Sequence, residues 1–425
     1  MTGLQAPRSS LVASVFANRL FAPLIIGLAV IVTAANAWLL GHPGLVRKPG
    51  LTDFQDFYVA GKLALEGRAS CAYAWDCLRA AQLAEFDRWE FMPWAYPPQF
   101  TVLVAGFALL PHGLSYAAFV LTSFSLFAWV VFRLAGRHSA FALALTMPAI
   151  LINLRSGQNG FLTGGLIGMF ALAFLNRRNI GGIALGAMIV KPHLAAASAL
   201  LVLLRWRWGM VIWAAATVIG STIAATLLLG PGIWPTFRNA AGVSAALLWQ
   251  GQFPIERMTS VFAMFYRFGA SPGAAMTAHI LVAGALLMGL GMIARRCADE
   301  RLVLAAVSAV TVLISPYTYD YDLTILTIAL ALIAPLIIDR ITGAEALLLG
   351  LLAWLSAANF AVTMFALEQI PGIERADQVW SISAPCIFGM IALCAKVVRR
   401  GDGAEALSAV AQRSAPDFAV GGEIR

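Results

Sequence analysis

Long apolar runs recur along almost the whole chain, and they limit its possible folds more than any other feature. Of its 425 residues, 60% are hydrophobic and only 12% are charged, whereas about a quarter of the residues in a typical soluble domain are charged. Runs such as 21–40 and 208–229 have the length of about 20 residues that an α-helix needs to cross a bilayer. Lipid offers no hydrogen bonds to the backbone, so such runs are expected to be helical. The sequence therefore predicts an all-α polytopic membrane protein.

We expect about twelve transmembrane helices in one domain, residues 1–397, with both chain termini in the cytoplasm. The tail, 398–425, is rich in small residues and is predicted to be cytoplasmic and without regular structure. The expected spans are 21–40, 99–112, 115–132, 139–153, 160–176, 180–204, 208–229, 273–294, 301–316, 321–339, 343–367 and 378–397.

The basic residues test this topology. In this topology, most basic residues at helix ends lie on the cytoplasmic face of the membrane, as the positive-inside rule requires. The exceptions are Arg133, Arg137, Arg177 and Arg178, which lie on the opposite face. A re-entrant segment within 133–180 would move Gln158 to the other side of the membrane.

The net charge of +8 comes largely from these short clusters at helix ends, so it indicates contact with a lipid bilayer and no nucleic-acid partner. The sequence contains no Walker-type phosphate loop, no glycine-rich dinucleotide motif, no His-Glu-x-x-His and no Cys/His metal spacing. We therefore expect no cofactor, and we expect any activated substrate to arrive within the membrane.

One long polar loop, 41–98, separates the first two expected spans and contains a third of the 21 acidic residues. Within it, 53–66 and 75–90 have apolar residues at helical spacing, which predicts two amphipathic helices on the membrane surface. Cys71 and Cys77 share this loop. A disulfide between them is plausible if the loop faces an oxidising compartment, but the sequence leaves their pairing open.

Asp53 and Asp56 are the most informative residues of this loop, because ionisable groups beside a bilayer are costly and usually functional. The carboxylate of Asp53 could act as a general base toward a hydroxyl nucleophile. Alternatively, Asp53 is the N-cap of the helix that follows it. Asp56 could orient a substrate or help to hold a metal ion, or it could be a solvated acid in the first helical turn.

Lys191 interrupts the apolar stretch 180–204, within the sequence Lys191-Pro192-His193. A lysine in this position needs an anion or a water-filled cavity, and Pro192 frees backbone groups that can line such a cavity. A phosphate is the ligand we expect. The alternative is an ion pair with an acidic residue of another span.

Other polar groups lie where spans begin or end, and each also has a structural explanation. Gln158 occupies a glycine-flanked turn, which needs no function, and Arg257 could bind an anionic headgroup or simply extend its charge to the interface. An aromatic and acidic strip precedes the span at 321–339 and suits a sugar, although such strips also form interfacial belts. The candidate substrate-binding residues are Asp56, Tyr58, Tyr96, Gln158, Lys191, His193, Arg257, Tyr319, Tyr321 and Asp322.

Several short motifs occur along the chain, namely Asp-Phe-x-x-Phe-Tyr-x-Ala-Gly at 53–61, Gly67, Tyr73, Tyr-Pro-Pro at 96–98, Leu-Leu-Pro at 109–111, Gly157-Gln158, Lys191-Pro192 and Ser315-Pro316. Taken in order, these motifs resemble glycosyltransferase family 87. The resemblance extends over roughly residues 20–340, and the order of the motifs is more specific than any one of them. The chain departs from the family near Asp320, where many relatives have Trp-Asp-His and this chain has Tyr-Asp-Tyr. No role of a histidine can therefore be transferred to that position.

The resemblance implies a GT-C type fold with its active site on the extracytoplasmic face of the bacterial inner membrane. It implies that Asp53 is the catalytic base and that a hexose, such as mannose, moves from a polyprenyl-phosphate donor to a glycolipid or glycan acceptor with inversion. We expect Lys191 and Arg257 to stabilise the phosphate and no metal ion to be required. The alternative function is a transporter or flippase for a lipid-linked saccharide, with the same polar residues along its path.

Overall fold

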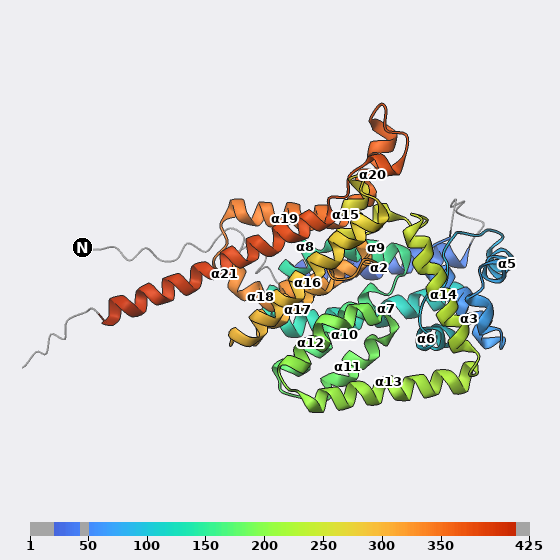
Figure 1. Cartoon of the computed structure of the whole chain (residues 1–425), viewed down its shortest axis with the longest axis horizontal. Coiled ribbons are helices and arrows are strands. Elements are labelled where there is room, and N and C mark those ends of the chain that lie inside the picture. Colours follow the sequence, from blue (N-terminus) through green and yellow to red (C-terminus); the bar gives the residue numbers. More distant parts are fainter. Residues whose placement is uncertain (1–20, 43–50, 414–425) are drawn as a thin grey trace, which may run out of the picture.

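The computed structural model describes residues 21–42 and 51–413, and most of this part is helical (Figure 1). By length and composition, five helical segments could cross a membrane, or six if α19 and α20, which are bent by 75°, form one span. This confirms an all-α polytopic membrane protein, although fewer segments reach this length than the expected twelve. The five segments are Phe21–Gly41, His112–Leu145, Trp208–Leu229, Pro272–Arg296 and Asp320–Ile338.

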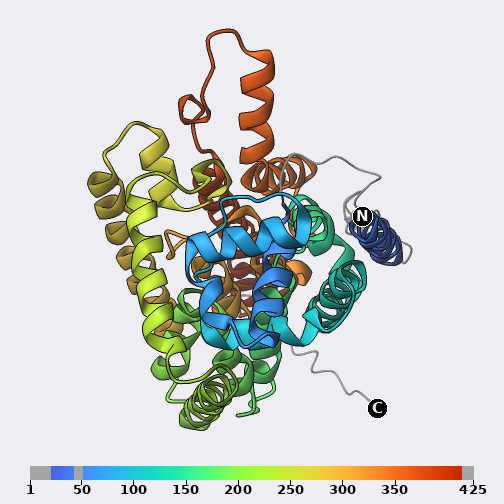
Figure 2. The same ribbon diagram turned by 90° about the vertical axis from the view of Figure 1, so that its right-hand side faces the viewer.

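Much of the described part of the polar loop that follows α2 (Phe21–Gly41) is helical. Both predicted helices are present, as α3 (Asp53–Leu65) and α5 (Trp75–Phe86), with the single turn α4 (Ala69–Ala72) between them. Helix α3, however, is buried along most of its length and does not lie on the surface as an amphipathic helix. Figure 2 shows these helices lying across one end of the bundle, which we call the loop end. A disulfide between Cys71 of α4 and Cys77 of α5 links these two helices.

The expected span at 99–112 is wrong, because this segment begins and ends at the loop end. It forms the short helix α6 (Pro98–Ala108), which packs against α3. Immediately after it, His112 Nδ1 lies 3.3 Å from the carbonyl oxygen of Leu40, near the end of α2. The chain between α2 and α7 therefore makes no net crossing.

The next three helical segments run back and forth through the bundle. They are α7 (His112–Ala135), the pair α8 (Ser139–Leu145) and α9 (Met147–Ser156), and α10 (Gly160–Leu175), with the 3-10 turn η2 (Gly136–His138) after α7. Tyr116, near the start of α7, donates a hydrogen bond to the carbonyl of Leu154, near the end of α9. The pair α8–α9 therefore returns to the loop end and places Gln158 there.

The expected span at 180–204 is also wrong, because it folds back on itself around Lys191. It consists of α11 (Gly181–Ala187), two 3-10 turns, η3 (Met188–Val190) and η4 (Pro192–Ala195), and α12 (Ala196–Leu204). The guanidinium of Arg207 after this hairpin lies 4.9 Å from the ring of Phe174 before it. Both ends of the hairpin therefore lie at the same end of the bundle.

The arginines at the ends of the spans meet at this second end, which we call the basic end. Arg205 donates to the carbonyl of Cys297 at 2.9 Å, and Arg340 donates to that of Val398 at 2.9 Å. Arg301 reaches Leu332 at 2.9 Å and the carbonyl of Leu134, next to Arg133. Because the segments 99–112 and 180–204 do not cross the bundle, the four arginines that contradicted the expected topology (Arg133, Arg137, Arg177 and Arg178) also lie at the basic end.

The remaining helices complete the bundle around α18 (Thr324–Ile338). The window that contains α18 is 89% buried, whereas that of α13 is 6% buried, so α18 is central and α13 faces outward. The tail continues helix α21 through Arg413, where no regular structure was expected, and residues 414–425 lie outside the described part. The other helices are α13 (Trp208–Leu229), α14 (Ile233–Trp249), η5 (Ile255–Arg257), α15 (Val261–Arg267), α16 (Pro272–Arg296), α17 (Glu300–Thr311), η6 (Asp320–Leu323), α19 (Gly343–Ala357), α20 (Asn359–Gln369), η7 (Ala376–Gln378) and α21 (Ser383–Arg413).

Candidate active site

Asp53 is the first residue of α3, and its carboxylate is not used to cap that helix. The N-cap is Thr52, whose backbone N–H donates to the side chain of Gln55 at 2.9 Å. The carboxylate of Asp53 instead accepts a hydrogen bond from Gln158 Nε2 at 3.1 Å and lies 3.7 Å from Arg257. With 19% of its side chain exposed, Asp53 is a partly buried acid held by two other segments of the chain. The capping alternative is therefore wrong.

Arg257 links Asp53 to the acidic strip before α18. Its Nε and Nη2 atoms donate to the two carboxylate oxygens of Asp320 at 3.2 and 3.1 Å, the bidentate geometry that fixes an arginine in orientation. An isolated β-bridge between Met258 and Tyr319 aligns the two segments beside this pair. Asp320 was not among the candidate site residues, although its place in the acidic strip could have revealed it.

Lys191, at the tip of the re-entrant hairpin, forms a buried ion pair with Asp322, at 2.8 Å. Their side chains are only 7% and 0% exposed, and the acid belongs to another segment, so the ion-pair alternative to a phosphate ligand is present. Lys191 Nζ also lies 4.5 Å from the ring of Tyr321, and the guanidinium of Arg257 lies 5.5 Å from the same ring. Two cations thus flank one aromatic ring.

Tyrosines and an amide fill the space between these charges. The rings of Tyr319 and Tyr321 stack with centroids 5.3 Å apart. Tyr96 donates to Gln158 Oε1 at 3.2 Å, so Gln158 connects the hydroxyl of Tyr96 with the carboxylate of Asp53. Gly157 has a φ of +66°, which lets the chain turn sharply and place Gln158 in this position.

Asp56 lies behind Asp53 and is buried, with 5% of the residue exposed, rather than solvated. It accepts a hydrogen bond from Gln82 Nε2 of α5 at 2.9 Å. Burial raises the pKa of Asp56 to about 7, and the nearby charge of Asp53 acts in the same direction, against the effect of the Gln82 hydrogen bond. Asp56 therefore ties α3 to α5 and can exchange a proton near neutral pH.

Two candidate residues lie outside this network of contacts. Tyr58 donates to the carbonyl of Leu110 at 3.2 Å and packs against His112. Tyr58 comes five positions after Asp53 in α3, so its side chain points to a different side of the helix. His193 is close to Lys191 but its Nε2 atom is buried and has no hydrogen-bond partner among the described residues. The other candidate residues, including Asp56, lie in this network of contacts or beside it.

The charges alternate across the cluster formed by Asp53, Arg257, Asp320, Lys191 and Asp322. The partly exposed carboxylate at its edge can also accept a hydrogen bond from a hydroxyl group, because each carboxylate oxygen can accept more than one hydrogen bond. Two cations beside an aromatic ring can bind an anion and a sugar face together. In the described part of the chain, no group of three or more acidic, histidine or cysteine side chains is placed to hold a metal ion.

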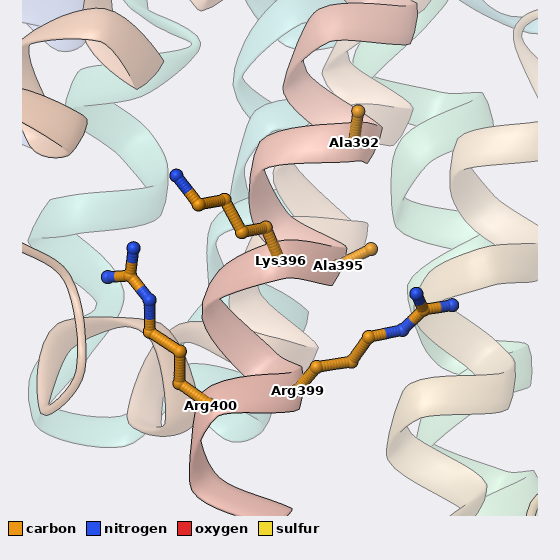
Figure 3. Close-up of a pocket in the computed structure, with 5 residues that line it drawn as sticks. All are labelled: Ala392, Ala395, Lys396, Arg399 and Arg400. Carbon is orange, nitrogen blue, oxygen red and sulfur yellow. The ribbon is translucent and has the colours of Figure 1, made fainter. Parts of the chain in front are cut away.

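A groove of about 520 Å³ lies elsewhere, on the C-terminal helix α21. Figure 3 shows Lys396 and Arg400 pointing to one side of α21 and Arg399 to the other. Lys396 and Arg400 form ion pairs with Glu345 at 3.3 and 2.6 Å, at the basic end. This groove belongs to the end of the molecule opposite Asp53.

In a comparison with protein families, residues 94–316 match glycosyltransferase family 87. This range covers just over half of the chain and contains Tyr96, Gln158, Lys191 and Arg257. Asp53 lies before it, but both of the residues that hold its carboxylate lie within it. No curated protein and no solved structure matches the sequence. The chain belongs to glycosyltransferase family 87 and is a membrane glycosyltransferase.

Proposed function

We propose that this protein transfers a hexose, such as mannose, from a polyprenyl-phosphate donor to a hydroxyl group of a glycolipid or glycan acceptor. The observation that supports it best is the Asp53 carboxylate, partly exposed and oriented by Gln158 and Arg257 of the family-matched region. Because the chain belongs to a glycosyltransferase family, we do not retain the flippase alternative.

In this proposal, Asp53 removes the proton from the acceptor hydroxyl as its oxygen forms a bond to the anomeric carbon. The bond between that carbon and the phosphate oxygen breaks, and its electron pair leaves with the polyprenyl phosphate. Attack opposite to the leaving group inverts the anomeric configuration. Gln158 keeps the carboxylate oriented for this step, at 3.1 Å.

The phosphate would lie beside Tyr321, between Lys191 and Arg257. Asp322 and Asp320 hold these two cations in position, and the phosphate would share them with the two acids. Pre-oriented cations are effective at stabilising charge that develops on a leaving group. His193, close to Lys191, offers a further polar atom to the same phosphate.

We further propose that the reaction takes place outside the cytoplasm of a bacterial cell, at its inner membrane. The positive-inside rule puts the basic end in the cytoplasm, which leaves Asp53 on the other side. The disulfide between Cys71 and Cys77 agrees with this orientation, because disulfides persist in oxidising compartments.

The test is sugar transfer by the purified protein in lipid nanodiscs. Radiolabelled polyprenyl-phosphate hexoses are supplied with total membrane glycolipids, and wild type is compared with Asp53→Asn. We expect the variant to lose at least about 100-fold in rate, the lower range for loss of a general base. Asp76→Asn, at an exposed position of the same loop, is the control and should keep full activity. Equal rates for Asp53→Asn and wild type would exclude Asp53 as the base.

A further inference from the structure

Two asparagines lie on either side of the turn that positions Gln158, and both are completely buried. Both polar atoms of the Asn153 side chain form hydrogen bonds within the protein. Its Nδ2 donates to the carbonyls of Ala149 at 2.9 Å and Tyr321 at 2.8 Å, and its Oδ1 accepts from the N–H of Gly160 at 3.0 Å. Asn153 therefore has a structural role, because it joins α9, the start of α10 and η6.

Asn159 is different, because neither Nδ2 nor Oδ1 of its side-chain amide has a hydrogen bond of normal geometry to a described residue, although the hydroxyl of Tyr96 lies near enough to interact with it. Its backbone is fully used, since the N–H donates to Gln158 Oε1 at 2.8 Å and the carbonyl accepts from Thr163 at 3.0 Å. A buried polar group without a partner costs about 1–3 kcal/mol. The fold therefore depends on the backbone of this position, and the amide side chain keeps hydrogen-bonding capacity that the protein does not fully use.

The surroundings of Asn159 are those of the proposed reaction. The preceding residue, Gln158, holds the Asp53 carboxylate and accepts from the hydroxyl of Tyr96. The Asn159 side chain is close enough to Tyr96 to influence that hydroxyl. A primary amide has two donors and one acceptor, and it can therefore both give a hydrogen bond to a hydroxyl group and take one from it.

We propose that the amide of Asn159 binds a hydroxyl group of the sugar that reacts at Asp53, and so helps to determine which sugar is used. The inference rests on the proposed function, because it requires a sugar beside Asp53. The hydroxyl belongs either to the hexose of the donor or to the acceptor, and the experiment separates these two sources.

The experiment measures affinity with the full-length protein in nanodiscs. The donor probes are polyprenyl-phosphate mannose, glucose and galactose, the monodeoxy analogues of whichever binds best, and sugar-free polyprenyl phosphate. The acceptor probes are methyl mannoside and its monodeoxy analogues. We expect wild type to bind one of the deoxy analogues about tenfold more weakly than it binds the parent sugar. Asn159→Leu, which keeps the volume, should bind the parent about tenfold more weakly and lose nothing further with that analogue.

A second readout does not depend on substrate. Thermal unfolding of Asn159→Leu should occur at the wild-type temperature or above it, whereas the matched variant Asn153→Leu should unfold at a lower temperature. Asn159→Ala repeats the affinity test if the leucine is not accommodated. Equal losses in wild type and variant for every analogue would overturn the inference, as would a destabilisation of Asn159→Leu equal to that of Asn153→Leu, which would indicate a structural water.

These outcomes are distinguishable from a failure of the proposed function. If wild type binds every sugar-bearing donor no more tightly than sugar-free polyprenyl phosphate, and transfers no sugar, the proposed donor is wrong. If wild type binds and transfers a hexose but no hydroxyl is coupled to Asn159, only the role of Asn159 is wrong.

Discussion

At the residue scale, neighbouring acids differ because their environments differ. Asp53 and Asp56 are less than one helical turn apart in α3, yet Asp53 is partly exposed beside Arg257, whereas Asp56 is buried against Gln82. Removing a carboxylate from water disfavours its charged form, and a second acid nearby adds to this effect. The same residue type therefore supplies one partly exposed acid beside Arg257 and one buried acid whose pKa is raised.

Asp56 should make the stability of the protein depend on pH. Its pKa of about 7 in the folded protein lies above the ordinary value of 3.8. The folded state therefore binds this proton more tightly than the unfolded state, and stability falls as pH rises from about 4 through about 7. This contribution amounts to at most about 4 kcal/mol, and Asp56→Asn should remove it.

The measurement is thermal unfolding in mild detergent at pH 5 and pH 8. The decrease in unfolding temperature between these values should be smaller in Asp56→Asn than in wild type. Asp76→Asn, at an exposed position, should behave as wild type. An unchanged decrease in Asp56→Asn would show that this carboxyl does not titrate differently on folding.

At the element scale, the site depends on how closely α10 approaches η6. Gly160 begins α10, and a Cβ atom there would collide with the carbonyl oxygen of Tyr321 and with the side chain of Asn153. Thr324 Oγ1 donates to the carbonyl of Gly160 at 2.8 Å across the same contact. Because η6 contains Tyr321 and Asp322, this approach sets the distance between the Gln158 turn and the Lys191–Asp322 ion pair.

Gly160→Ala should therefore damage both stability and activity. The added methyl group has no space, and overpacking of this kind costs about 1–3 kcal/mol. The variant should lower the unfolding free energy by that amount and also reduce the rate of sugar transfer, because Tyr321 must move.

Gly106→Ala is the matched control, since Gly106 lies in helix α6 and has open space around the position of a Cβ atom. Alanine there should raise the stability by about 0.5–1 kcal/mol, as in other helices, and leave activity unchanged. If both substitutions had the same effect, the close approach of α10 and η6 would not be important for the site.

At the scale of the whole molecule, two segments that do not cross the bundle determine which residues meet. Helix α6 returns to the loop end, and the α11–α12 hairpin returns to the basic end. With these corrections, the arginines after α7 and after α10 lie at the same end as Arg205 and Arg340. This arrangement also moves Gln158 to the end where Asp53 lies.

Cysteine labelling in intact cells tests this topology. The free cysteines Cys297, Cys386 and Cys394 are first replaced by alanine, and the disulfide is retained. A membrane-impermeant maleimide should then label Ala80→Cys, in α5, from outside the cell. Arg178→Cys should react only after the membrane is permeabilised. Labelling of Arg178→Cys in intact cells would instead support the twelve-span topology expected from the sequence.

The sequence by itself determined the class of the protein, because a hydrophobic run of about 20 residues has few alternatives to a helix in a membrane. It also identified the loop helices and most residues of the candidate site, since polar groups are conspicuous in an apolar chain. The pairing of Asp320 with Arg257, the burial of the Asn159 amide and the bonding of Asp56 to Gln82 came only from the tertiary structure. Hydropathy records how well a segment tolerates lipid, but not whether it crosses or turns back. The ion pairs of Lys191 and Arg257 join residues 131 and 63 positions apart, and such pairings depend on the packing of the whole bundle.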